Sequence, residues 1–270
     1  MPKELFRGKM TSESIRDFWN NLAEKYDTDP TTTIRDMHFK YLEIEEVRKF
    51  LQSKDVVLDV GCGNGLQTIH YSQDVKEIIG IDFAEKMIAV ANKIADEFSD
   101  KSVTIKNNLK FMTGDILNIN FPKNTFDKVI VERVLINLPT KEDQANAVHE
   151  IFRVCRKNGL IILVESTKQG HDRVDFFRKL FGLEPIQKHE NNLYIDEVEF
   201  LDILKGKFDI LEVKRFGMYH FISKVLYPLF VYPEEQQFNS KFNELARKIG
   251  SKITDFEGCS HHVMFVLRRV

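Results

Sequence analysis

Three glycines spaced two residues apart, Gly61, Gly63 and Gly65, follow an apolar run in the stretch VVLDVGCGNGL at 56–66. Because glycine has no Cβ, such a loop can turn sharply and lets a ligand lie against the main chain. A loop of this kind between a strand and a helix places backbone N–H groups at the carboxyl edge of a parallel sheet, where ligands bind. Asp82 ends the next strand-like run and suits hydrogen bonds to a ribose diol. The pattern predicts binding of an adenosine-containing cofactor.

The spacing of the glycines indicates which cofactor this is. The dinucleotide fingerprint G-x-G-x-x-G would need glycine at position 66, where the sequence has Leu66, and the observed spacing is G-x-G-x-G. With Asp59 before it, the string LDVGCGNG resembles motif I of the class I S-adenosylmethionine-dependent methyltransferases. The resemblance covers about residues 50–166 and implies S-adenosylmethionine as the cofactor. A glycine turn needed only to pack a helix on a strand is the alternative.

The resemblance implies a set of cofactor-binding residues around this loop. In the family pattern Asp59 helps orient the methionine amino group, and the adenine edge is met at the position of Asp115, which could equally cap a turn. A segment like FWNNLAEKYD packs against the cofactor in similar enzymes and contains Tyr26. The full set is Asp59, Gly61, Cys62, Gly63, Gly65, Asp82, Phe83, Met87, Asp115, Ile116, Glu132 and Tyr26.

The acceptor side is expected around FDKVIVERVLINLP, which looks like the family segment that faces the sulfonium and the incoming acceptor. Guanidinium groups suit an anionic acceptor, and a loop histidine can act as a base near neutral pH. An ordinary ion pair with a surface carboxylate is the alternative for Arg133. Without any H-x-x-x-H or H-x-H spacing, no metal site is predicted. The predicted catalytic residues are Arg133, His189 and His261, and the predicted substrate-binding residues are Arg35, Asn137, Tyr194 and Tyr219.

The elements that must position these residues alternate between strand and helix from Val56 to Ser166. The runs VVLDV, IIGID, DKVIVER and LIILVES are continuously apolar, which is typical of parallel strands buried on both faces. We therefore predict an α/β, Rossmann-like, doubly wound fold with a seven-stranded, mainly parallel sheet. The resemblance implies that the last strand, at 261–269, runs antiparallel.

Three parts of the chain follow from this pattern. Residues 1–50 are expected to form an N-terminal helical cap, and residues 51–216 with 261–270 the cofactor-binding α/β domain. Residues 217–260, rich in aromatic side chains, are expected to form a helical lid insertion over the acceptor site. The alternative is that these aromatics are core of an appended helical layer.

Composition limits the partners and the compartment. With 39 basic and 41 acidic residues, the net charge of −2 gives no general attraction to nucleic acid. Three scattered cysteines argue against a disulfide framework and fit a reducing cytoplasm. No apolar run is long enough to span a membrane. We expect a small-molecule acceptor as partner, and a homodimer remains an option.

These observations predict a methyltransferase that uses S-adenosylmethionine to methylate an O or N atom of a small metabolite. A phosphate- or carboxylate-bearing acceptor is a narrower expectation. A second one is surface-polysaccharide biosynthesis, because the FRKLFGLEPI and NNLYID runs resemble such methyltransferases. The alternatives are an NAD-dependent oxidoreductase, which Leu66 disfavours, and a non-catalytic regulatory protein that binds S-adenosylmethionine.

Overall fold

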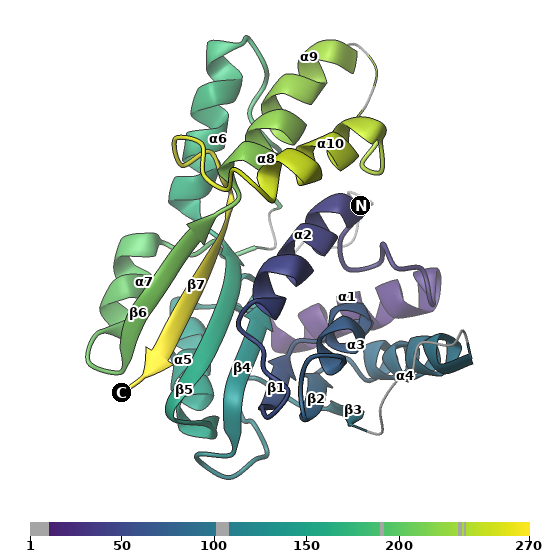
Figure 1. The fold of residues 1–270 in the computed structure, drawn as a ribbon, viewed down its shortest axis with the longest axis vertical. Coiled ribbons are helices and arrows are strands. Elements are labelled where there is room, and N and C mark those ends of the chain that lie inside the picture. The colour runs from purple at the N-terminus through teal and green to yellow at the C-terminus, as the bar shows by residue number, and fades with distance from the viewer. Residues whose placement is uncertain (1–10, 101–107, 190–191, 232–233, 235) are drawn as a thin grey trace.

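The computed structural model describes residues 11–270 except 101–107, 190–191, 232–233 and 235 (Figure 1). Its centre is a seven-stranded sheet in the order β3-β2-β1-β4-β5-β7-β6. The first five strands pair in parallel, and β7 runs antiparallel to both β5 and β6, which confirms the predicted fold class. The strands are β1 (Val56–Val60), β2 (Glu77–Asp82), β3 (Leu109–Thr113), β4 (Phe126–Glu132), β5 (Cys155–Ser166), β6 (Phe208–Arg215) and β7 (His262–Arg269).

The central strands are apolar because helices cover both of their faces. On one face Leu58 and Val129 pack in a cluster with α5 and α7, and on the other Val57 and Ile130 pack with α2, α8 and α10. The strand order reverses between β1 and β4, and ligands of such sheets bind outside the carboxyl ends of the strands at this point. The helices are α1 (Ser12–Tyr26), α2 (Met37–Arg48), α3 (Leu66–Ser72), α4 (Glu85–Asp100), η1 (Leu135–Asn137), α5 (Lys141–Val154), α6 (Lys168–Leu180), α7 (Glu197–Leu204), α8 (Gly217–His220), η2 (Phe221–Leu226), α9 (Tyr227–Val231) and α10 (Lys241–Gly250).

Several helices gather at the carboxyl end of the parallel strands, at the top of Figure 1, where α2 approaches α8 and α10. Asp36 ties this layer together. Its side chain caps α2, accepts a hydrogen bond from the hydroxyl of Tyr219 at 2.6 Å and one from Nδ2 of Asn243 at 3.0 Å. Segments from the two ends of the chain therefore cover the same edge of the sheet. We call the layer formed by α2, α8, η2 and α10 the roof.

The roof contains one element that the sequence pattern did not indicate. Between α8 and α9 the chain forms the π-helical segment η2, a geometry that is rare and is found mostly as short pieces at functional sites. Residues 217–260 are otherwise largely helical, as expected for a lid, but the division of the chain into cap, domain and lid remains a prediction. Residues 1–10 of the expected cap and 232–233 and 235 of the expected lid lie outside the described residues.

No helix among the described residues is long and apolar enough to cross a membrane.

Candidate active site

The glycine loop lies between β1 and α3, as predicted. Gly61, Gly63 and Gly65 all have positive φ angles, of 72°, 53° and 74°, which side chains rarely adopt. A Cβ at Gly61 would lie 2.2 Å from Cγ2 of Val134, and one at Gly63 would lie 2.8 Å from Cγ2 of Thr33. At Gly65 a Cβ would lie 2.6 Å from the ring of Phe111 and 2.8 Å from Cβ of Ala91. In this structure the groups that approach the loop are therefore protein side chains, from β3, from α4, from the turn after β4 and from the segment before α2.

Asp82 holds the glycine loop to the end of β2. Its Oδ2 accepts a hydrogen bond from the backbone N–H of Gly63 at 3.0 Å, and its Oδ1 accepts one from Ala84 at 2.9 Å. Burial raises the pKa of this carboxyl to about 6. Because each carboxylate oxygen has a second lone pair, Asp82 can accept further hydrogen bonds from a ribose diol while it keeps the loop in place.

A cavity of about 50 Å³ lies beside the loop and leads towards the ends of α1 and η1. Gly61, Phe83, Asp115, Ile116 and Asn137 line it, so it collects five of the predicted site residues. Oδ1 of Asp115 also accepts a hydrogen bond from the N–H of Leu117 at 2.9 Å, so this side chain caps its turn as the alternative interpretation held. The remaining lining residues are Ser12, Ile15, Val60, Gly114, Leu117, Val134, Leu138 and Pro139.

Arg133 follows β4 with a φ angle of 58°, and its guanidinium is held by side chains of α2 and α3. Its Nη1 lies 2.6 Å from both carboxylate oxygens of Glu43, and its Nη2 donates to Oε1 of Gln67 at 3.3 Å. The alternative interpretation placed Arg133 in an ion pair, and such a pair is present, but its carboxylate is fully buried on α2 instead of lying at the surface. Arg133 therefore positions the roof over the end of β4.

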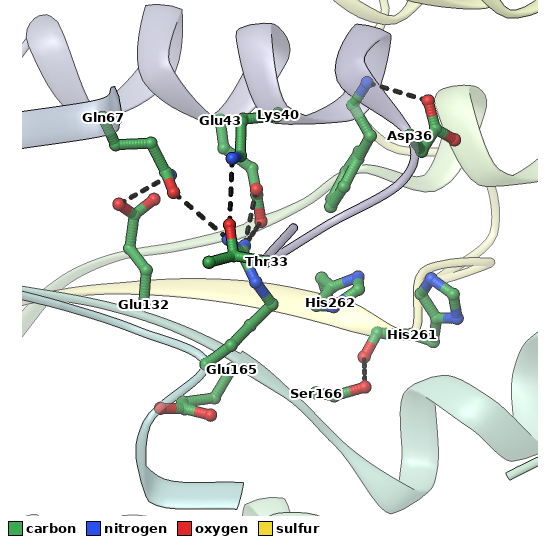
Figure 2. Close-up of polar contacts among 12 residues, drawn as sticks. Thr33, Asp36, Lys40, Glu43, Gln67, Glu132, Glu165, Ser166, His261 and His262 are labelled. Carbon is green, nitrogen blue, oxygen red and sulfur yellow. Dashed lines mark hydrogen bonds and ion pairs between the residues drawn. The ribbon is translucent and has the colours of Figure 1, made fainter. Parts of the chain in front are cut away.

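Glu132, one residue earlier, has one oxygen in use and one without a partner. Its Oε2 accepts hydrogen bonds from Nε2 of Gln67 at 2.8 Å and from the hydroxyl of Tyr71 at 3.0 Å. Its Oε1 is buried and finds no hydrogen-bond partner among the described residues. Figure 2 shows Glu132 and Gln67 side by side, with Glu43 and Lys40 descending from α2. Burial raises the pKa of Glu132.

Two further ionisable groups complete the surroundings of Glu132. Lys40 is fully buried and donates to the carbonyl of Pro30 at 3.1 Å and to Oγ1 of Thr33 at 2.9 Å. Burial, with a smaller effect of Arg133, lowers its pKa to about 7. Asp59 accepts a 2.5 Å hydrogen bond from the hydroxyl of Thr68. Burial, with a smaller effect of Glu132, raises its pKa to about 7.

We call Lys40, Glu43, Asp59, Glu132 and Arg133 the charge cluster. With all five groups ionised it carries three negative charges and two positive ones. A buried site with a net charge of −1 and an unpartnered carboxylate oxygen suits a ligand with a cationic donor group, because burial without such a partner is costly. The ammonium group of S-adenosylmethionine meets this requirement, and its sulfonium adds a positive charge without donating a hydrogen bond, so the residues fit the cofactor that the sequence implied.

Glu165 at the end of β5 organises the turn that follows β4. Its Oε1 accepts hydrogen bonds from the N–H groups of Val134 and Leu135 at 2.9 and 2.8 Å, and Oε2 lies 3.4 Å from that of Ile136. Burial raises the pKa of Glu165 to about 8, although these three N–H groups lower it. The side chain holds η1 and therefore one wall of the cavity.

Of the residues predicted to contact the acceptor, His189 and Tyr194 contact each other, whereas Arg35 has no contact of this kind with a described residue. His189 donates its backbone N–H to the hydroxyl of Tyr194 at 3.0 Å, and Tyr194 meets the ring of His171 with centroids 4.5 Å apart. Burial lowers the pKa of His189, and the charge of Arg35 has a smaller effect in the same direction. No hydrogen bond or ion pair joins Arg35 to another described residue.

Two predicted residues, Tyr219 and Met87, are placed differently from the expectation. Tyr219 has no exposed surface and gives its hydroxyl to Asp36, so it supports the roof and does not line an acceptor site. Met87 is likewise fully buried, in a cluster with α1 and α3 that Tyr26 covers from outside. The burial of a tyrosine or methionine in a helical layer depends on how the helices pack, which the sequence pattern around these residues does not contain.

Sequence reasoning missed Lys40 and Glu43 of the charge cluster, together with Glu165 and the two partners of Glu132. Lys40, Glu43 and Glu46 are spaced three apart on α2, and all three are buried. The signal that could have found them is this repeat of charges at i and i+3 within HFKYLEIEE, since residues with that spacing share one face of a helix.

Part of the sequence is similar to known methyltransferases. Residues 58–163 match the methyltransferase domain family. The demethylmenaquinone methyltransferase of Lactococcus lactis is 26% identical over 183 residues, which are 65% of this chain and 66% of that protein, just under two thirds of its length. An uncharacterized methyltransferase of Schizosaccharomyces pombe is 33% identical over 124 residues, 44% of this chain and 42% of that protein.

Solved structures share the fold at low sequence identity. Phosphoethanolamine N-methyltransferase 1 of Haemonchus contortus, solved with S-adenosylhomocysteine, has a TM-score of 0.62 at 16% identity and covers 98% of this chain and 51% of its own. Magnesium protoporphyrin IX methyltransferase of Synechocystis has a TM-score of 0.54 at 16% identity, covering 98% and 90%. The [4+2]-cyclase SpnF has a TM-score of 0.55 at 18% identity, covering 85% and 80%. The fold alone thus accommodates more than one chemistry.

Proposed function

We propose that this protein transfers a methyl group to an acceptor bound beneath the roof. The premise is that the chain carries the domain and fold of the class I S-adenosylmethionine-dependent methyltransferases. The observation that carries the proposal is the unpartnered Oε1 of Glu132 beside the glycine loop. A buried carboxylate oxygen without a donor is costly, and an ammonium group of the cofactor would supply the missing hydrogen bond.

The same proposal assigns the remaining parts of the cofactor site. Asp59, with its pKa near neutrality, would add a second negative charge at the amino-acid end. Asp82 would accept hydrogen bonds from the ribose, and the cavity beside Asp115 and Ile116 would receive the adenine. Val134 and Thr33 stand over the glycines, so both side chains must move aside when the amino-acid end settles on the main chain.

Methyl transfer requires little covalent chemistry from the side chains of the protein. S-adenosylmethionine supplies a methyl group that its sulfonium already activates. The chain must hold a nucleophile in line with the carbon–sulfur bond and exclude water, which accounts for most of the rate in such reactions. The roof, locked to Arg133 through Glu43 and to Asp36 through Tyr219, is suited to both tasks.

For the acceptor we propose an O or N atom of a small metabolite. Arg35, which pairs with no described residue, would receive an anionic group, and His189 would take the proton from a hydroxyl. Carbon methylation is a second candidate, because the demethylmenaquinone methyltransferases among the relatives act on carbon. The relatives named above include no enzyme of polysaccharide biosynthesis, so that narrower expectation gains no support. A homodimer and the absence of nucleic acid remain predictions.

Calorimetric titration of the purified protein with S-adenosylmethionine, S-adenosylhomocysteine and NAD tests the cofactor assignment. We expect both sulfur compounds to bind and NAD to give no heat. Transfer is then measured with radiolabelled S-adenosylmethionine against phosphorylated amino alcohols, sugar phosphates and demethylmenaquinone. NAD binding without binding of either sulfur compound would contradict the proposal, and cofactor binding without transfer to any acceptor would favour a regulatory protein.

A further inference from the structure

Four histidines from three separate segments meet under the roof. His171 belongs to α6 and His220 to α8, while His262 begins β7 and His261 directly precedes it. One ring nitrogen of each of His220, His261 and His262 lies within 4.8 Å of those of the other two. The ring centroids of His220 and His261 are 4.1 Å apart, and those of His261 and His262 are 4.5 Å apart. These histidines do not have a metal-binding spacing in the sequence, so the sequence alone did not indicate that they come together.

Ser260 fixes the tautomer of His220. The Ser260 hydroxyl donates its single proton to the backbone carbonyl of His262, and its oxygen accepts the backbone N–H of Phe216 at 2.9 Å. Nδ1 of His220 lies 3.2 Å from the same oxygen and must therefore be the donor in that contact. The proton sits on Nδ1, and Nε2 of His220 carries a lone pair. This Nε2 is buried and has no partner among the described residues.

Ser166 repeats the arrangement on the other side. Its hydroxyl donates to the backbone carbonyl of His261 at 3.0 Å, so it accepts the proton of Nε2 of His171 across 3.1 Å. The lone pair of His171 is then on Nδ1. Nδ1 of His171, of His261 and of His262 are all buried without a partner among the described residues. Burying a polar nitrogen without a hydrogen bond costs about 1–3 kcal/mol, so several such nitrogens in one place call for a shared partner.

We propose that His220, His261 and His262 bind a divalent transition-metal ion of the kind that prefers imidazole, with Zn²⁺ as the reference. Neutral imidazole is the form that binds metal, and each of these rings has a buried nitrogen with no partner among the described residues. Tetrahedral zinc with bonds of about 2.0–2.1 Å places its ligand nitrogens about 3.4 Å apart. The rings must close by up to about 1.4 Å from the limit seen here.

The three histidines form an open site. Three protein ligands leave a fourth tetrahedral position for water or for an oxygen of another molecule. The site lies at the edge of the sheet where β5 and β7 pair Ser166 with His262 (Figure 2). Glu165, which holds η1, precedes Ser166 directly. A role for the ion in activating an acceptor oxygen would rest on the proposed methyl transfer, whereas the binding site itself does not.

Metal binding can be measured without any assay of activity. The full-length protein is stripped with a chelator, dialysed and titrated with Co²⁺, whose visible absorption reports tetrahedral coordination, and Zn²⁺ is then used to displace it. We expect one Co²⁺ per chain and a visible band that Zn²⁺ removes. Ser260→Ala should weaken binding by about 10–100-fold, the usual effect of losing a partner that orients a ligand. His220→Ala should weaken it further still.

Two controls keep the outcome clear. His149→Ala changes an exposed histidine of α5 and should bind Co²⁺ like the wild type. If His220→Ala fails to fold, His261→Gln replaces it, since that side chain is only half-buried, with circular dichroism and S-adenosylmethionine affinity as checks on folding. Absence of the tetrahedral band in the wild type, or Co²⁺ affinity unchanged by the ligand substitution that is used, would overturn the proposal. Weaker Co²⁺ binding in that variant, together with wild-type binding in His149→Ala, would support it.

Discussion

Replacing Glu132 by glutamine should weaken binding of S-adenosylmethionine strongly while sparing the fold. The amide keeps an oxygen that can accept the hydrogen bonds of Gln67 and Tyr71. In place of the unpartnered Oε1 it then presents an NH₂ group, which can only repel a cationic donor. A hydrogen bond between charged groups contributes about 1.5–3 kcal/mol, so the dissociation constant should rise about 13- to 160-fold.

The free energy of unfolding of the ligand-free Glu132→Gln variant should increase or stay unchanged. Burial raises the pKa of Glu132, which means that its charge is costly where it lies, and the neutral amide removes that cost. Calorimetric titration gives the affinity of each variant, and chemical unfolding gives its free energy of unfolding. A loss of affinity together with unchanged or increased stability distinguishes a contact with the cofactor from general damage.

Glu46→Gln is the matched control for this substitution. Glu46 is also a buried carboxylate, but its Oε2 pairs with Lys49 and Lys214, away from the glycine loop. The change removes the same charge and should leave the affinity within about twofold of the wild type, since no bond to the ligand is lost. If Glu132→Gln also binds S-adenosylmethionine within twofold, the proposed contact with Glu132 is wrong. If both variants lose affinity equally, the effect is one of overall charge.

Three further predictions concern the same site. Because the pKa of Asp59 is raised to about 7, the carboxyl is mostly neutral at pH 6 and ionised at pH 8. Affinity for S-adenosylmethionine should therefore rise by up to about tenfold over this interval, and a pH-independent affinity, or the same slope in Asp59→Asn, would contradict this. Asp82→Ala should weaken cofactor binding by about 1–3 kcal/mol in calorimetry, and unchanged affinity would remove Asp82 from the site. Glu165→Gln should change the free energy of unfolding at pH 7 by less than about 1 kcal/mol, because a carboxyl with a pKa of about 8 is already mostly protonated. Glu165→Ala should cost about 1–3 kcal/mol for each backbone N–H left unpaired, and equal effects of the two substitutions would refute the explanation.

The sheet and the glycine loop could be predicted because their determinants are local. Strands such as β1 and β4 are buried on both faces, and this requirement appears directly as a continuous apolar run. Gly61, Gly63 and Gly65 are needed because of their positive φ angles, a property of each residue alone. Asp82 follows from the same logic, since it stands at the end of a strand whose position was already clear.

The roof and the histidine site could not be predicted, because they depend on contacts between distant segments. Lys40 and Glu43 are charged, so their sequence suggests a solvated helix face, yet packing of α2 over the sheet buries them. Arg133 was expected to contact the acceptor, but its guanidinium forms an ion pair with Glu43, which lies 90 residues earlier in the sequence. His171, His220 and His262 are brought together only when α6, α8 and β7 have taken their places.

The hydrogen bonds of Asp36 have a consequence for the order in which the protein becomes functional. Its partners Tyr219 and Asn243 lie 183 and 207 residues further along the chain. Contacts of such sequence separation form late, because a long loop must close before they can stabilise anything. On the ribosome the glycine loop and β1 emerge early, whereas the roof cannot lock until α10 has been synthesised. A nascent chain would thus display a half-built pocket open to water, and protection of the site from solvent would arrive only after α10 has been synthesised.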